Sequence, residues 1–495
     1  MIKRYEDSEI AMIWSDENKL NLWQKTELAV IKARVKLGYV SQEIFNKISK
    51  ILLKTPIDLD WWKKRDNEIH HDLQAFIDER LRFLSIDLQR FLHERMTSYD
   101  TEEPAFSQML KKSLSRVHDF FSELMQDIAK LALHYRYTIM NARTHGQEAE
   151  LQSFGKRCLT WYRELQVDLD NLKRAEKNLC FSKLSGAVGN YGGIDPELEK
   201  EALKILGFKP FYGATQIIPR AVFAPIAQAL AQIVSTLNKI AIDVRLGARS
   251  GRAICQEPFA KKQKGSSKMP HKKNTISTEQ TEGMARMANK FFQMIMDNIP
   301  TWEERSIEQS CVERVAWPDL FHVVVRSIKV MTKILTGLRV YPDVMIQEII
   351  ESRGCYAAGE AKEVLRELGV EFGLTSEEAY RIIQLAAFNV FRSTKMAQEI
   401  RESPPTSLIE ADSWFEKFKN TSPPPVDSIQ EIIIEARIET SEDLEATDYD
   451  VQRWNSVLSK IFQNQENLLR WNQIFLPSYL LRNETRLFQE VLGAK

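Results

Sequence analysis

The stretch Pro225–Val244, PIAQALAQIVSTLNKIAIDV, has the clearest periodicity in the chain. Large apolar residues recur in it at intervals of four, three, four, three and four: Ile226, Leu230, Ile233, Leu237, Ile240 and Val244. This spacing aligns them along one side of an α-helix and is typical of the seam between helices in a coiled-coil-like bundle. The stretch therefore predicts a long helix in a bundle core.

The neighbouring sequence extends this prediction to an all-α fold. Segment 111–142 carries a similar stripe through Leu114, Val117, Phe121, Leu124, Ile128 and Leu131. Between Gly38 and Gly186 only Gly146 and Gly155 interrupt the chain, which suits long helices. No stretch combines sustained alternation with β-branched enrichment, so we expect no substantial sheet.

Three domains are expected along the chain. Residues 1–110 are predicted to form an N-terminal helical domain, and 111–352 a central domain of long helices that carries a Lys-rich loop at 261–275. Residues 353–495 are predicted to form a C-terminal domain of shorter helices. Apolar stripes this extensive are expected to bury surface against other subunits as well.

Composition narrows the class of protein. The 495 residues include 68 Lys and Arg and 68 Asp and Glu. This balance argues against an overall positive electrostatic field that would attract nucleic acid or a membrane surface. The five cysteines are widely spaced without a C-x-x-C pair, so we expect reduced thiols in the cytoplasm. The charged N-terminus does not resemble a signal peptide, and no long uninterrupted apolar run predicts a membrane span.

The most unusual segment is Lys261–Asn274, KKQKGSSKMPHKKN, with six lysines. A basic run of this kind is compatible with a solvated surface loop or a nucleic-acid patch. The order of residues favours another interpretation. Gly265 permits a close backbone approach, two serines follow it, and Lys272 and Asn274 offer a charge and an amide to a carboxylate. Closure of such a loop over a dianionic substrate would exclude water.

Residues 265–274, GSSKMPHKKN, resemble the G-S-S-x-M-P-x-K-x-N signature of the fumarase/aspartase superfamily, whose members eliminate fumarate from substituted succinates. The resemblance implies a three-domain fold whose central bundle assembles into a twenty-helix homotetramer core, with active sites built from three subunits. It also implies Ser266 as catalytic base, Lys272 and Asn274 as stabilisers of the dianionic intermediate, and Ser267 and Met269 as binding residues. Lys268 and Thr275 depart from the usual pattern.

A second motif lies at Arg143–Gln147. A lone histidine is more often structural than catalytic, but Thr144, His145 and Gly146 resemble the superfamily's T-H motif. This resemblance implies that His145 is the general acid toward the leaving nitrogen and that Thr144 binds substrate. Glu279 is then expected to orient a catalytic histidine.

Two further segments match the superfamily. Met96–Asp100 resembles the L-T-S-x-D stretch that binds the succinyl carboxylates, which implies this role for Thr97 and Ser98; Arg95 stands where glycine is usual. Lys183–Gly189 is similar to the family's K-x-S-G-A-V-G run. Thr215-Gln216 resembles its T-Q stretch, which implies that Gln216 contacts substrate.

Three further segments resemble adenylosuccinate lyases in particular: Arg4-Tyr5 near the start, His71-Asp72, and the pattern that contains Arg305, Ser310 and Arg314. The resemblance covers about residues 1–375. The three segments imply a nucleotide-binding role for Arg4, Tyr5, Arg305, Ser310 and Arg314, and a catalytic role for His71, with His70 in place of the usual arginine. Guanidinium groups suit phosphate oxygens. The alternative for Arg305 and Arg314 is ordinary ion pairing with neighbouring glutamates.

The resemblance implies that fumarate is eliminated from adenylosuccinate to give AMP and from SAICAR to give AICAR, in purine biosynthesis. The alternatives are another superfamily enzyme, such as argininosuccinate lyase or a carboxymuconate cycloisomerase, or a catalytically silent structural homologue. The expected partners are a nucleotide substrate and identical subunits, without nucleic acid or membrane. The eight histidines form no H-x-x-x-H or H-E-x-x-H motif, and no metal or other cofactor is expected.

Overall fold

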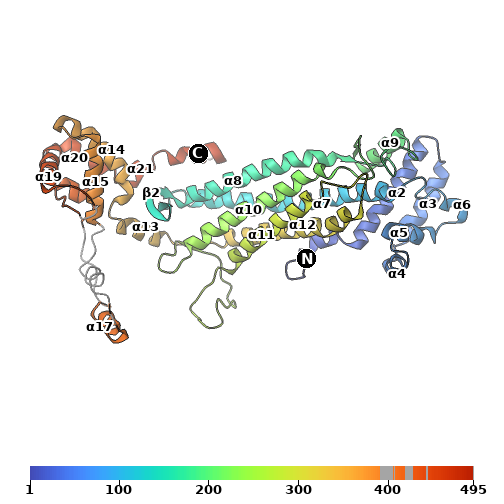
Figure 1. Ribbon diagram of the computed structural model, residues 1–495, viewed down its shortest axis with the longest axis horizontal. Coiled ribbons are helices and arrows are strands. Elements are labelled where there is room, and N and C mark those ends of the chain that lie inside the picture. Colours follow the sequence, from blue (N-terminus) through green and yellow to red (C-terminus); the bar gives the residue numbers. More distant parts are fainter. Residues whose placement is uncertain (391–404, 406, 419–426, 442–443, 494–495) are drawn as a thin grey trace. The chain divides into compact units, whose positions relative to one another are not determined.

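The computed structural model describes residues 1–390, 405, 407–418, 427–441 and 444–493. Helices make up most of these residues and the strands are short, which confirms the predicted all-α class (Figure 1). The chain divides into two compact units. The first unit comprises Met1–Ile128, Trp161–Arg249 and Cys255–Arg339, and the second comprises Ala129–Thr160, Ser250–Ile254 and Val340–Lys495.

The first unit begins with short and medium helices and continues into a bundle. Its helices are α1 (Ser8–Ile13), α2 (Asp16–Lys36), α3 (Gln42–Lys54), α4 (Leu59–Ile69), α5 (Asp72–Leu81), α6 (Ile86–Gln89), α9 (Pro196–Leu206), α10 (Ala224–Gly247), α11 (Ile276–Met296), α12 (Ile307–Thr336) and the 3-10 turns η1 (Glu176–Cys180) and η2 (Arg220–Val222). The short strands β3 (Phe181–Ser182) and β4 (Lys209–Pro210) pair in parallel, and β5 (Cys255–Gln256) follows. Helices α7 (Ser98–His134) and α8 (Phe154–Ala175) each contribute to both units.

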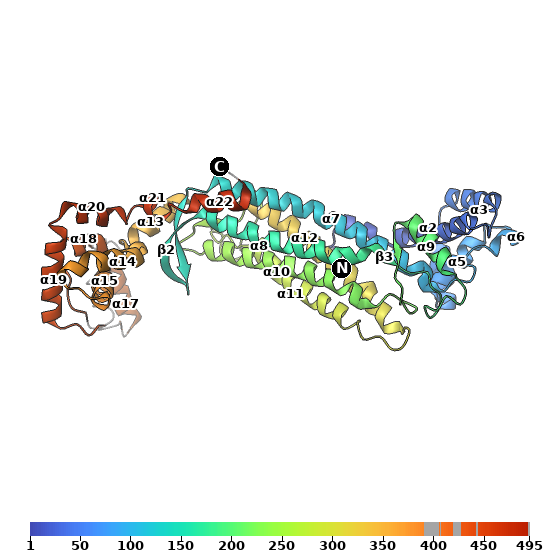
Figure 2. The same ribbon diagram turned by 90° about the horizontal axis from the view of Figure 1, so that it is seen from above.

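Helix α10 is the core helix that its periodicity predicts. All six residues of the predicted seam, Ile226, Leu230, Ile233, Leu237, Ile240 and Val244, are completely buried. The helix packs along α11 and α12 (Figure 2). Burial of each such side chain stabilises the fold by roughly 1.5–3 kcal/mol. By length and composition alone residues 220–247 could also cross a membrane, but 56% of the apolar window is buried inside the protein, as in a bundle core.

Helix α7 confirms part of the stripe predicted for 111–142. Its residues Leu114, Val117, Phe121, Leu124 and Ile128 are buried. The helix starts earlier, at Ser98, and ends at His134 rather than near 142. A Cβ on Gly155 would lie 2.4 Å from the backbone oxygen of Ala132, so only glycine lets the returning chain pass this close to the helix.

The segment that follows α7 forms an antiparallel hairpin of β1 (Ile139–Thr144) and β2 (Gln147–Ser153). Its two-residue turn has left-handed φ angles of 53° at His145 and 78° at Gly146, as a type I′ turn requires. The sequence by itself predicts no strand here. The reason is that β1 does not alternate clearly, that β2 alternates only through Ala149 and Leu151 without a β-branched residue, and that His-Gly is a weaker hairpin signal than Asn-Gly.

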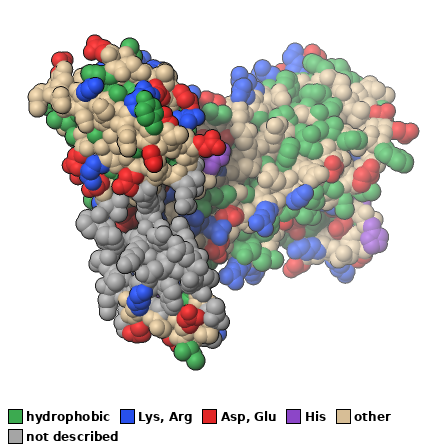
Figure 3. Space-filling view, turned by 60° about the vertical axis from the view of Figure 1, so that its left-hand side comes forward, with side chains coloured by type: hydrophobic (Ala, Val, Ile, Leu, Met, Phe, Trp, Pro, Cys, Tyr) green, Lys and Arg blue, Asp and Glu red, His purple; other side chains and the backbone are tan. Residues whose placement is uncertain are grey.

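The second unit contains mostly shorter helices. They are α13 (Pro342–Glu351), α14 (Ala358–Gly369), α15 (Ser376–Val390), α17 (Leu408–Phe418), α18 (Ile429–Ile434), α19 (Asp448–Phe462), α20 (Gln465–Gln473), α21 (Pro477–Leu480), α22 (Glu484–Leu492) and the turns η3 (Cys355–Ala357) and η4 (Val370–Phe372); strand β6 (Arg339–Val340) precedes them. Trp454, Ile461 and Trp471 lie in their shared core. Side chains of both charges are interspersed on the face that Figure 3 shows.

Candidate active site

His71 lies where two short helices of the first unit meet. Helix α4 ends at Ile69, its C-cap His70 has a left-handed φ of 53°, and His71 caps the N-terminus of α5. Its Nδ1 accepts a hydrogen bond from the backbone N–H of Gln74 at 3.2 Å. Its Nε2 lies 3.5 Å from Oγ of Ser98. Because Nδ1 serves as the acceptor, the neutral ring carries its proton on Nε2, which faces Ser98.

Thr97 and Ser98 form the turn that opens α7. The backbone N–H of Thr97 donates to Oδ2 of Asp100 at 2.9 Å, and the N–H of Asp100 donates back to the Thr97 carbonyl at 2.9 Å. Arg95, which replaces a glycine of the family pattern, has a left-handed φ of 59°. The turn thus presents two hydroxyls at the positive end of a long helix, where anions are favoured.

Gln216 and Arg305 meet although 89 residues separate them. Nη1 of Arg305 donates to Oε1 of Gln216 at 3.0 Å, and the guanidinium lies 4.2 Å from the ring centre of Tyr99. Oγ1 of Thr215 donates to the carbonyl of Glu304 at 2.7 Å. Arg305 is therefore held by an amide and an aromatic ring, not by the neighbouring glutamates of the alternative interpretation.

A cavity of about 390 Å³ opens beside these residues. Its lining comprises Trp14, Asp16, Lys19, Trp23, Trp62, Asp66, Asp72, Tyr99, Glu102, Glu103, Phe106, Met109, Arg220, Ser310, Glu313, Arg314 and Pro318. Nη2 of Arg314 contacts Oδ2 of Asp72 at 2.8 Å, next to His71 in the sequence. The cavity thus brings Ser310 and Arg314 together with the histidine segment, and none of its lining residues comes from 261–275.

Buried charges surround the cavity. The guanidinium of Arg220 pairs with Glu103 at 2.6 Å and with Glu313 at 2.9 Å. Burial raises the pKa of Glu313 to about 7, although Arg220 favours its charged form. Burial and the nearby Asp72 carboxylate likewise raise the pKa of Glu102 to about 7. Two carboxyl groups that titrate near neutral pH are a feature that the sequence analysis missed.

Glu102 leads to a prediction on the pH dependence of stability. Its pKa is raised from 4.5 to about 7 on folding, so its contribution to stability is fully present below about pH 4.5 and is lost as the pH rises through about 7. In wild type this group makes the free energy of unfolding fall between pH 5 and 8. In Glu102→Gln we expect that fall to be smaller by on the order of 1–3 kcal/mol. Urea unfolding at the two pH values measures this difference. An equal loss in Glu102→Gln, in wild type and in the exposed control Glu123→Gln would contradict the assignment.

The Lys-rich loop precedes α11 and makes hydrogen bonds within itself. Oγ of Ser266 accepts from the backbone N–H of Met269 at 3.1 Å, and Nδ2 of Asn274 donates to the Gly265 carbonyl at 2.7 Å. A Cβ on Gly265 would lie 1.9 Å from the carbonyl oxygen of Lys272, so this crossing of the loop requires glycine. Asn274, which is predicted to hold a carboxylate, closes the base of the loop through this hydrogen bond.

The start of α11 is stabilised by Glu257, a buried residue that the sequence analysis missed. Its carboxylate accepts from the backbone N–H groups of Ser277 and Thr278, both at 3.0 Å. This contact satisfies two of the free N–H groups at the helix start. Glu279, one residue further on, is exposed and lies 3.8 Å from Arg245. No signal in the sequence distinguished Glu257 from a surface carboxylate.

Four predicted residues lie outside these clusters. Thr144 and His145 are exposed at the tip of the β1–β2 hairpin, which belongs to the second unit. Arg143 beside them pairs with Glu148 at 3.3 Å and with Glu348 at 3.2 Å. Near the N-terminus Arg4 is exposed, and the ring of Tyr5 lies 5.1 Å from the Arg326 guanidinium.

Comparison with known proteins identifies the family. A family model described as "Lyase" matches residues 3–288. The adenylosuccinate lyase of Thermotoga maritima is 34% identical over 395 residues, 80% of this chain and 90% of the relative. The adenylosuccinate lyase of Aquifex aeolicus is 33% identical over 421 residues, 84% of this chain and 94% of the relative. The chain belongs to the adenylosuccinate lyase family.

The fold agrees with this membership. A solved structure titled fumarate lyase, from Mesorhizobium sp. BNC1, superposes with a TM-score of 0.74 at 18% identity, and the match covers 99% of each chain. This likeness confirms the expected superfamily fold. Of the motif residues, Asp72, Ser310 and Arg314 line the cavity. His71 contacts Ser98, and Arg305 contacts Gln216 and the ring of Tyr99, which also lines the cavity.

Proposed function

We propose that this lyase eliminates fumarate from adenylosuccinate to give AMP, and from SAICAR to give AICAR, in purine biosynthesis. The observation that carries the proposal is the pairing of Arg314 with Asp72 at a cavity beside His71 and Ser98. This arrangement brings a guanidinium for a phosphate, a helix start for a carboxylate and an imidazole into one region. The 34% identity to the Thermotoga maritima adenylosuccinate lyase supports the same substrate.

The nucleotide part of the substrate binds through Arg314 and Ser310, together with Arg305. Arg314 is half exposed, and Asp72, the carboxylate that pairs with it, lines the same cavity. A phosphate can therefore approach the free side of the guanidinium and form two parallel hydrogen bonds. Arg4 and Tyr5 are proposed to complete phosphate binding in an assembled oligomer.

Thr97 and Ser98 bind the carboxylates of the succinyl part, and Gln216 contacts the substrate beside them. The difficult step is removal of a proton from carbon next to a carboxylate. Ser266, acting as an alkoxide-like base, takes this proton and becomes a neutral hydroxyl. The electron pair left on carbon delocalises into the adjacent carboxylate, which gives a dianionic aci-carboxylate. Lys272, Asn274 and the loop N–H groups stabilise that charge, with Ser267 and Met269 holding the substrate; one such donor contributes on the order of 3 kcal/mol.

Collapse of the intermediate forms the carbon–carbon double bond of fumarate and breaks the bond from carbon to nitrogen N6. His145 donates a proton to the departing nitrogen, so the products are fumarate and a neutral amine. Thr144 holds the substrate beside it, and Glu279 orients a catalytic histidine. His71 assists near the leaving nitrogen or the phosphate, in keeping with a proton on Nε2.

Assembly of identical subunits is part of the proposal. The hairpin tip with His145 and the loop with Ser266 belong to different compact units of one chain. In a homotetramer, a catalytic site would draw these segments and the cavity from three subunits. The proposal keeps the division into domains 1–110, 111–352 and 353–495 and a cytoplasmic location. It includes no cofactor, nucleic acid or membrane.

The direct test is incubation of the purified protein with adenylosuccinate while the ultraviolet absorbance of the purine is followed. We expect release of AMP and fumarate in equal amounts. Argininosuccinate and carboxymuconate serve as parallel substrates for the two alternative enzymes. Turnover of either one without turnover of adenylosuccinate would overturn the proposal, and inactivity toward all three would favour the silent homologue.

The role of Arg314 gives a separate prediction. Removal of one charged hydrogen-bond partner costs about 1.5–3 kcal/mol, so we expect Arg314→Ala to raise the KM for adenylosuccinate roughly 10–100-fold with a smaller change in kcat. Arg65→Ala is a control, because Arg65 is also partly exposed and pairs with Asp78 and Glu68. An unchanged KM in Arg314→Ala would instead support an ordinary surface ion pair.

A further inference from the structure

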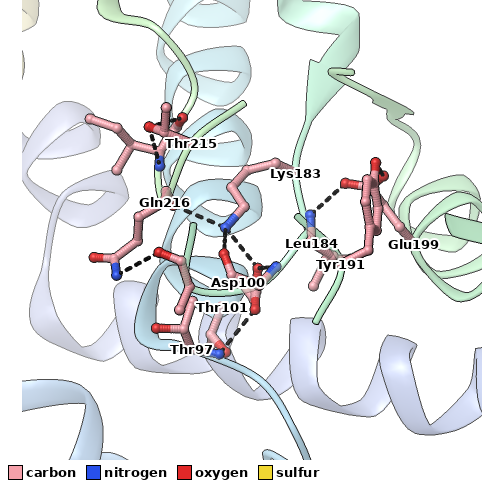
Figure 4. A network of polar contacts seen from close by, with 12 residues as sticks. Thr97, Asp100, Thr101, Lys183, Leu184, Tyr191, Glu199, Thr215 and Gln216 are labelled. Carbon is pink, nitrogen blue, oxygen red and sulfur yellow. Dashed lines mark hydrogen bonds and ion pairs between the residues drawn. The ribbon is translucent and has the colours of Figure 1, made fainter. Parts of the chain in front are cut away.

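Lys183 places a charged ammonium group in the interior of the first unit, close to the proposed binding residues. Its side chain is completely buried. Nζ lies 2.8 Å from Oδ1 of Asp100, 3.0 Å from the Gly186 carbonyl and 2.9 Å from the Gln216 carbonyl (Figure 4). An ammonium has three N–H donors, and these three contacts use all of them.

Asp100 is equally well occupied. Besides the ammonium, Oδ1 accepts the backbone N–H of Gly186 at 3.1 Å. Oδ2 accepts the backbone N–H of Thr97 at 2.9 Å. The ion pair therefore joins three segments that are distant in sequence: the turn that starts α7, the loop at Gly186 and the stretch with Gln216 (Figure 4).

The connection continues to residues that face the substrate. The side chain of Gln216 donates to the Ala187 carbonyl at 3.1 Å and accepts from Arg305 at 3.0 Å. The backbone carbonyl of the same glutamine is the one that Lys183 holds. A continuous set of hydrogen bonds thus runs from Thr97 through Asp100 and Lys183 to Gln216 and Arg305.

Stability alone does not account for this arrangement. Burial of two charges carries a large desolvation cost, and an apolar pair of similar volume often stabilises a protein as well or better. The charged pair provides geometric specificity, because each hydrogen bond from Lys183 fixes the position of one particular carbonyl or carboxylate oxygen. A compact ammonium with three donors suits such a junction better than a planar guanidinium does.

We propose that Lys183 is a positioning residue that holds the carboxylate-binding turn at Thr97–Ser98 in register with Gln216 and Arg305. It acts through Asp100 and two backbone carbonyls and does not touch the substrate. The inference rests on the proposed function in so far as these segments bind the succinyl part. Loss of the junction would let the two segments shift independently, and a displacement of about 1 Å can lower the rate of an enzyme about 100-fold.

The test compares Lys183→Met and the double variant Lys183→Met/Asp100→Asn with Arg80→Met in the full-length protein. Arg80 is a matched control, because it is also completely buried and pairs with Glu79 and the carbonyls of Thr55 and Pro56. We expect both Lys183 variants to lose about 100-fold in kcat/KM for the folded protein. Arg80→Met is expected to lower the melting temperature while kcat/KM stays within about threefold of wild type.

The double variant removes both charges of the Lys183–Asp100 pair, so neither is left buried without the other, and it serves where the single variant does not fold. Hydrogen exchange of the backbone amides of Thr97 and Gly186 is the second readout, and we expect faster exchange in the folded double variant than in wild type. Hydrogen exchange does not depend on turnover. It therefore tests the positioning role even if the protein does not cleave adenylosuccinate, and the two proposals can fail independently. Unchanged exchange, or activity lost only in proportion to the unfolded fraction, would overturn the inference.

Discussion

Ser266→Ala is expected to lower kcat for adenylosuccinate by roughly 10²–10⁴-fold, the contribution of a well-placed general base. The serine is otherwise a very weak base, so the proposed chemistry depends on desolvation and on the neighbouring positive charge of Lys272. In the structure its Oγ accepts only a local hydrogen bond from Met269, at 3.1 Å, within an otherwise exposed loop. Its loss should therefore leave the melting temperature and ligand affinity nearly unchanged.

The adjacent Ser267→Ala variant is the control for this result. Both serines lie in the same loop, but Ser267 is proposed only to bind substrate, so its removal should affect kcat much less. Steady-state turnover and binding of AMP by calorimetry separate chemistry from affinity. Wild-type turnover by Ser266→Ala would exclude this serine as the base, and a larger effect of Ser267→Ala would assign that role to its neighbour.

His145→Gln is expected to have the second large effect, a similar loss in kcat together with loss of one limb of the bell-shaped pH–rate profile. The physical reason is that glutamine cannot supply a proton to the leaving nitrogen near neutral pH. The pH dependence of kcat/KM measures this directly. A profile that keeps both limbs would exclude His145 as the titrating acid.

The hairpin geometry calls for a control that separates chemistry from backbone strain. His145 has a φ of 53°, a left-handed conformation that asparagine adopts more readily than most residues. His145→Asn should therefore preserve the type I′ turn while removing the imidazole. If His145→Asn retained wild-type activity and only His145→Gln lost it, turn strain would explain the loss and the acid role would be wrong.

Mixing of inactive subunits tests the shared site. Ser266→Ala and His145→Gln damage opposite sides of the proposed reaction, and their residues lie in different compact units. We expect partial recovery of activity when the two variants are unfolded and refolded together, because some hybrid sites receive both intact residues. Hybrid oligomers without recovered activity would argue against sites that draw these residues from different subunits.

Local sequence patterns determined the helical class and the motif residues. The seam of Ile226 to Val244 is completely buried in α10 because a period of 3.6 residues fixes which side chains share a face, whatever the helix packs against. The same reasoning failed beyond His134, where the helix predicted for 111–142 does not continue. There the polar strands of the hairpin depend on pairing with each other, and the preceding apolar stripe suggested a longer helix.

Only the tertiary structure decided which charged groups meet. Arg314 contacts Asp72, 242 residues away, whereas its sequence neighbour Glu313 pairs with the buried Arg220. Lys183 likewise reaches Asp100 rather than a nearby carboxylate. Periodicity and motifs describe residues within a few turns of one another. Ion pairs over such separations, and the pKa shifts that follow, depend instead on which helices pack together and on how much water they exclude.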